Sequence, residues 1–166
     1  MRSETKTINY YQFSELSKKA AQRAIEKLWD INVNYEWWDS IYDDAMNMGL
    51  KISGFDIYRN DITLILNWSG IDCAKKIIQD HGETCSTFIV AKKYIDEYKK
   101  IEAKRNDDNY DCDLEIADLE EDFKKEMEGE YLSILRSEYE NLASKEAIIE
   151  TIEANEYEFD IDGNMI

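Results

Sequence analysis

The sequence predicts an α+β protein, in which a small antiparallel sheet is covered by helices and a long acidic C-terminal helix lies alongside. Three observations indicate this class. Apolar residues recur at helical spacing in several segments, residues 50–68 have the pattern of two strands joined by a turn, and helical phase is kept from Ile116 to Leu142. Apolar side chains make up 43% of the 166 residues, enough for a core of ordinary size.

The first half of the chain alternates between strand and helix patterns. Ser17 and Asn34 are good N-cap residues, and Gly49 is placed to end the second helix in the left-handed conformation. Gly54 interrupts the first strand of the hairpin, as at a β-bulge. Strands are therefore expected over about residues 5–11, 50–57 and 62–68, and helices over about residues 18–29 and 35–48.

The second half is mainly helical. Apolar positions keep their phase across Gly129, which predicts one helix there, with a kink or turn at the glycine as the alternative. Ser144 is placed to cap the helix that follows. Helices are expected over about residues 71–79, 87–105, 114–142 and 145–155, and a strand over about residues 157–161. No linker is long enough to separate domains, so residues 1–166 are predicted to form a single domain.

The net charge of −17 divides this chain into two parts. Residues 1–106 carry 16 acidic and 16 basic side chains, together with 14 of the 20 aromatic ones. Residues 107–166 carry 21 acidic and 4 basic side chains, and so hold the whole excess. The first part is charge-balanced and aromatic, whereas the second is acidic and mainly helical. Because such an excess repels nucleic acid, no direct nucleic-acid partner is expected.

Several features predict a cytoplasmic protein. No apolar run approaches the ~20 residues that a membrane-spanning helix needs, so no membrane partner is expected. The first residues lack the apolar stretch of a secretory signal. Cys73, Cys85 and Cys112 are odd in number and show no CxxC spacing, which favours thiols over a disulfide framework or a zinc site.

No catalytic residue, metal site or cofactor is predicted. His81 is the only histidine, and a nucleophilic pair with Cys85 has no third group to orient it, so a position at a helix end is favoured. The acidic segments 106–113 and 160–163 have oxygen ligands for calcium, but not the glycine and glutamate at EF-hand spacing. Both segments are interpreted as solvated turns.

Aromatic and cationic residues of the first part form a candidate ligand site. Trp38 and Tyr42 are four residues apart, on one face of the expected helix, whereas Trp37 points about 100° away from Trp38. Such rings can stack on a base, and a helix starting at Asn34 would suit a phosphate. The candidates for binding a small nucleotide-like ligand are Trp37, Trp38, Tyr42, Tyr58, Arg59 and Trp68. A homo-oligomer whose second subunit completes the site is one version of this hypothesis, and core packing of the tryptophans is the alternative.

The acidic part has two interpretations. Its carboxylates form the solvated face of an amphipathic helix, paired in part with Lys93, Lys100 and Lys104 of the preceding helix. Alternatively, they form a surface that binds a basic protein by imitating the charge of nucleic acid. The residues expected to bind such a partner are Glu120, Glu121, Asp122 and Glu126.

A resemblance to known proteins covers about two fifths of the chain. It rests on ELSKKAAQRAIEKLWDINVNYEWWDSIYDDAMNMGLKISGFDIYR, residues 15–59, and AIIETIEANEYEFDIDGNMI, residues 147–166. Both resemble a family of small phage and prophage accessory proteins labelled antitoxin-like. The resemblance implies a counter-defence role in the host cytoplasm, exercised by binding and without catalysis. Sequestration of a nucleotide-derived signalling ligand is the favoured function, because aromatic and cationic residues are concentrated together, away from the acidic excess. Antitoxin-like or DNA-mimicking inhibition of a basic host protein is the alternative.

Overall fold

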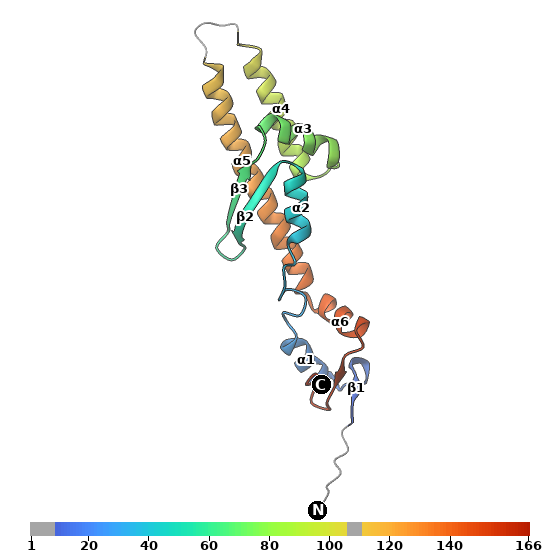
Figure 1. Ribbon diagram of the computed structural model, residues 1–166. Helices are drawn as coiled ribbons and strands as arrows, with labels where there is room; N and C mark the ends of the chain where they lie inside the picture. The colour runs from blue at the N-terminus through green and yellow to red at the C-terminus, as the bar shows by residue number, and fades with distance from the viewer. Residues whose placement is uncertain (1–8, 106–110) are drawn as a thin grey trace, which may run out of the picture. The chain divides into compact units, whose positions relative to one another are not determined.

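The computed structural model describes residues 9–105 and 111–166, whose helices and short antiparallel strands confirm the α+β class (Figure 1). The elements are β1 (Tyr11–Gln12), the 3-10 helix η1 (Phe13–Glu15), α1 (Lys18–Lys27), α2 (Asp39–Asn47), β2 (Leu50–Asp56), β3 (Asp61–Leu66), α3 (Gly70–Asp80), α4 (Ser86–Glu102), α5 (Cys112–Leu142), α6 (Lys145–Ala154) and β4 (Glu158–Phe159). None of the helices in these described ranges is long and apolar enough to cross a membrane.

The described residues pack as two compact units. Unit 1 combines the residues up to Trp37 with Glu138–Ile166, and unit 2 is Trp38–Ser137. The strands form two separate two-stranded sheets, β1 with β4 in unit 1 and β2 with β3 in unit 2. The unit boundaries therefore differ from residue 106, where the charge balance of the sequence changes.

In unit 1, β1 and β4 pair antiparallel, with Tyr11 opposite Phe159. Both strands are shorter than the sequence predicts, and residues 5–8 of the first expected strand lie outside the described part. The caps are as predicted, because the Ser17 and Ser144 hydroxyls each accept an amide N–H three residues later at 3.2 Å. A buried apolar cluster joins the sheet to α1 and α6 and consists of Ala24, Ile25, Ile148, Ile152 and Phe159.

In unit 2, the β2–β3 hairpin confirms the predicted strands and bulge, because its register shifts between Ile52 and Gly54. The predicted start of α2 is wrong. Trp37 donates its N–H to the Tyr35 carbonyl in a tight turn, and helical hydrogen bonding begins only at the Trp38 carbonyl. The helix thus starts at Asp39, and Asn34 does not cap it.

The long helix α5 runs without interruption through Gly129, as the apolar phase predicts. Six of its residues are buried, at the spacing of one helix face: Cys112, Phe123, Met127, Tyr131, Leu132 and Leu135. Within unit 2 its side chains also reach the hairpin. The Glu128 carboxylate accepts the Leu64 N–H at 3.1 Å, and the Arg136 guanidinium donates to the Ile57 carbonyl at 3.2 Å.

Alanine substitution at two glycines should have opposite effects on stability. Gly49 has a φ of +79°, and a Cβ there would lie 2.4 Å from the Trp68 ring, so Gly49→Ala should lower the free energy of unfolding by about 2 kcal/mol or more. Gly129 is helical and a Cβ there would meet nothing within 4 Å, so Gly129→Ala should raise it by about 1 kcal/mol. Urea unfolding measures both, and equal effects would contradict the left-handed end of α2.

Candidate functional site

The structure places the adjacent tryptophans in different units. The Trp37 ring packs against Tyr139 of unit 1, with ring centroids 5.7 Å apart. The Trp38 and Tyr42 rings of unit 2 both meet Phe55 on β2, at 5.5 and 6.2 Å. All three candidate rings are half-buried, and each has an aromatic partner within its own unit. These contacts favour the packing interpretation of the two tryptophans.

The remaining candidates lie at opposite ends of the hairpin. Tyr58 is 80% exposed in the turn, where the Arg59 side chain lies 3.6 Å from the Asp56 carboxylate. Trp68 follows the other end of β3 and lies over Gly49, with 46% of its surface exposed. Since Asn34 starts no helix, the expected phosphate position at that residue is also wrong.

His81 takes part in a polar cluster that links α2, α4 and α5 in unit 2. Its Nδ1 lies 2.7 Å from the hydroxyl of Thr87, a buried residue, and its Nε2 lies 3.3 Å from the Asp44 carboxylate without the alignment of a hydrogen bond. The Tyr131 hydroxyl donates to the other Asp44 oxygen at 2.9 Å. Burial, reinforced by that carboxylate, raises the pKa of Tyr131. The imidazole thus lies between the Thr87 hydroxyl, which is within hydrogen-bond distance, and the nearby Asp44 carboxylate. Cys85, the thiol considered as its nucleophilic partner, is exposed.

The acidic turn after β4 is stabilised by the protein's own donors. The Asp160 carboxylate accepts the backbone N–H groups of Asp162 and Asn164 at 2.9 Å each. Hydrogen bonds from Asn164, first from its side chain, lower the pKa of Asp160. Asp162 pairs with Arg23 at 3.2 Å. No metal-binding group of three ligands occurs among residues 9–105 and 111–166, and residues 106–110 of the other acidic segment lie outside those ranges.

The four acidic candidates of α5 divide into two kinds. Glu120 is half-buried and accepts the Gly70 N–H at the start of α3 at 2.6 Å. Glu126 accepts a hydrogen bond from the Lys93 ammonium at 2.5 Å. Glu121, whose carboxylate lies 3.9 Å from the Lys124 ammonium, and Asp122 are exposed. With the exposed Asp118 they form what we call the α5 acidic stripe. Only two of the four predicted residues therefore belong to an outward-facing acidic surface.

No family model matches this chain, and neither does a curated protein or a solved structure. The resemblance to antitoxin-like phage proteins therefore stays a prediction.

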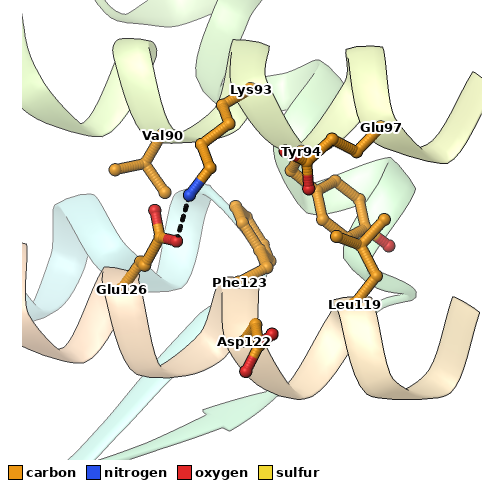
Figure 2. A pocket seen from close by; sticks show the side chains of 8 residues that line it. All are labelled: Val90, Lys93, Tyr94, Glu97, Leu119, Asp122, Phe123 and Glu126. Carbon is orange, nitrogen blue, oxygen red and sulfur yellow. Dashed lines mark hydrogen bonds and ion pairs between the residues drawn. The ribbon is translucent and has the colours of Figure 1, made fainter. Parts of the chain in front are cut away.

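Next to the acidic stripe, α4 and α5 enclose a hollow of about 50 Å³, which we call the α4–α5 groove (Figure 2). Its lining consists of Val90, Lys93, Tyr94, Glu97, Leu119, Asp122, Phe123 and Glu126. The ring centroids of Tyr94 and Phe123 lie 4.5 Å apart, and these two almost fully buried rings form its aromatic wall. None of the six residues predicted to bind a ligand lines it.

Charges surround this aromatic wall. Figure 2 shows Lys93 reaching from α4 toward Glu126 on α5, beside the Phe123 ring. The hydrogen bond and charge of Glu126 raise the pKa of Lys93, and the carboxylates of Glu97 and Asp122 add to the effect. Pairing of Lys93, Lys100 and Lys104 with the acidic helix was predicted, and the Lys93–Glu126 pair confirms it for Lys93. The groove itself was not predicted, because its position depends on which turns of the two helices face each other.

Alanine substitution of Glu120 and of Glu121 should affect stability differently, because Glu120 binds a backbone amide and Glu121 is exposed. Glu120→Ala leaves the partly buried Gly70 amide without its charged acceptor, which should lower the free energy of unfolding by about 1.5–3 kcal/mol. Glu121→Ala removes an exposed side chain and should change it by less than about 0.5 kcal/mol. Urea unfolding of both variants is the measurement, and a similar loss in both would contradict the capping role of Glu120.

The three thiols should differ in reactivity. Cys85 is exposed, whereas Cys73 and Cys112 are buried, and burial raises the pKa of Cys73 to about 11. Since the thiolate is the reactive form, iodoacetamide at pH 8 should alkylate Cys85 first and Cys73 only after unfolding. Peptide mass spectrometry over time distinguishes the sites. Rapid alkylation of Cys73 in the folded protein would show that the packing around α3 is wrong.

Proposed function

We propose that this chain is a non-catalytic binding protein that neutralises a basic host protein by covering a cationic surface with its acidic face. The observation that carries the proposal is the α5 acidic stripe, Asp118, Glu121 and Asp122, exposed beside a groove whose lining includes Glu97 and Glu126. The resemblance to phage accessory proteins supplies the setting, a counter-defence role in the cytoplasm of the host cell.

The arrangement of the aromatic residues supports this function over sequestration of a nucleotide. Trp37 packs with Tyr139, whereas Trp38 and Tyr42 pack with Phe55, so these rings contribute to the interiors of two different units. A stacking platform would instead need neighbouring rings with accessible faces. The helix start that would have received a phosphate lies at Asp39, where an acidic side chain opposes an anion.

The acidic stripe has the properties that electrostatic recognition requires. Asp118 and Asp122 are four residues apart on one helix face, so their backbone positions differ by about 6 Å along the axis. A helix holds such charges at constant spacing, and the net charge of −17 extends the attraction toward a cationic partner. Charge complementarity of this kind mainly raises the association rate and selects the partner.

Neutralising the stripe should weaken partner binding without unfolding the protein. The triple variant Asp118→Asn, Glu121→Gln, Asp122→Asn should lose about tenfold in affinity at physiological salt, because each exposed ion pair contributes up to about 1 kcal/mol. A matched control removes three exposed charges from α6: Glu146→Gln, Glu150→Gln and Glu153→Gln. The partner is captured from host cells and identified by mass spectrometry. Calorimetry then gives the affinity of the wild type and both variants.

Salt provides a second readout for the same proteins. Wild-type binding should weaken steeply as salt rises, since exposed charges are screened beyond about 8 Å at physiological ionic strength, and the stripe variant should show a smaller dependence. Equal affinities for the stripe and α6 variants would refute the stripe as the binding surface. Binding that is independent of salt would refute the electrostatic mechanism.

A further inference from the structure

We infer that the α4–α5 groove receives one arginine side chain of the basic partner, and that Lys93 occupies this position when the partner is absent. The inference rests on the proposed function, since it states how a cation of that partner is bound. The groove belongs entirely to unit 2 and shares Asp122 with the acidic stripe.

The lining of the groove suits a cationic head group. Three carboxylates belong to it, on Glu97 of α4 and on Asp122 and Glu126 of α5, against the single ammonium of Lys93. One further positive charge is therefore attracted even with Lys93 in place. The Tyr94 and Phe123 rings also line the groove but are almost fully buried against each other, so the carboxylates supply the attraction for a cation.

The size of the groove selects a side chain over a larger ligand. A hollow of about 10–15 Å³ admits one water molecule, so 50 Å³ has room for a guanidinium or an ammonium but not for a nucleotide. Of the two head groups, the planar guanidinium can donate to two carboxylates at once, whereas an ammonium acts as a point charge. Arginine is therefore the better occupant.

Lys93 shows that the groove accepts an alkylammonium group. Its ammonium donates to the Glu126 carboxylate at 2.5 Å, and its side chain remains 55% exposed. An exposed pair of this kind contributes little to stability and exchanges readily with solvent. An incoming arginine can therefore replace the Lys93 ammonium at Glu126, while Lys93 turns toward water. In this way Lys93 competes with the partner for Glu126. A weakly cationic surface would not displace it.

The first test uses a defined probe, an octapeptide of arginine, and the same peptide made of citrulline, which is neutral and similar in shape. In NMR titrations of the full chain, the arginine peptide should shift the methyl signals of Val90 and Leu119 and the ring signals of Phe123. The citrulline peptide should leave these signals unchanged. Arginine-induced shifts confined to residues outside the groove would overturn the inference.

The second test uses charge-matched variants on one helix. Lys93→Met should tighten binding of the arginine peptide about two- to fivefold relative to Lys92→Met, because both remove one positive charge from α4 but only Lys93 lines the groove. Glu97→Gln should weaken binding relative to Asp96→Asn by a similar factor. Thermal unfolding identifies any variant that no longer folds. If a variant of one pair fails to fold, the comparison within the other pair tests the inference.

The outcomes separate this inference from the proposed function. If each groove variant equals its control while the stripe variant loses affinity, the partner binds the stripe alone and the groove inference is wrong. If the groove variants change peptide affinity as expected but the stripe variant keeps full affinity for the host partner, the groove binds cations and the proposed function is wrong.

Discussion

Unit 2 depends on α5 because charged side chains of this helix satisfy backbone groups that other elements leave unpaired. Glu120 accepts the N–H of Gly70 at the start of α3, Glu128 accepts the N–H of Leu64 on β3, and Arg136 donates to a carbonyl of the hairpin turn. Helix starts, sheet edges and turns are where a chain lacks its own partners. Because an unsatisfied buried group costs about 1–3 kcal/mol, these contacts fix the hairpin and α3 against one helix.

This constraint changes how the acidic composition has to be interpreted. Glu120 and Glu128 lie among the acidic residues of the same helix as Asp118 and Asp122, yet the first two bind backbone amides and the last two are exposed. A charge count gives all four the same weight. The surface available to a partner is therefore smaller than the sequence suggests, and of its exposed carboxylates Asp122 also lines the α4–α5 groove.

The features predicted correctly from the sequence are those that depend on neighbouring residues. Ser17 and Ser144 cap helices through amides three residues away, and the apolar phase through Gly129 identifies α5. The error at Asn34 has a distant cause, because the preceding Asn32 donates to the Leu142 carbonyl and accepts from Thr151, more than 100 residues later. The groove likewise depends on a match between α4 and α5 that periodicity does not encode.

Ion pairs between α5 and the preceding helical region neutralise only part of the negative charge of α5, so an acidic surface remains. Lys93 of α4 binds Glu126, and Arg105, which follows the end of α4, binds Asp113, so both cations are paired with carboxylates of α5. Residues 107–130 contain 12 acidic and 2 basic side chains, more negative charge than these pairs can neutralise. Asp118 and Asp122 are exposed one helical turn apart, so their charges repel each other and lower the stability of the compact state. A partner that brings its own cations would relieve this repulsion, which favours binding as the role of the exposed carboxylates.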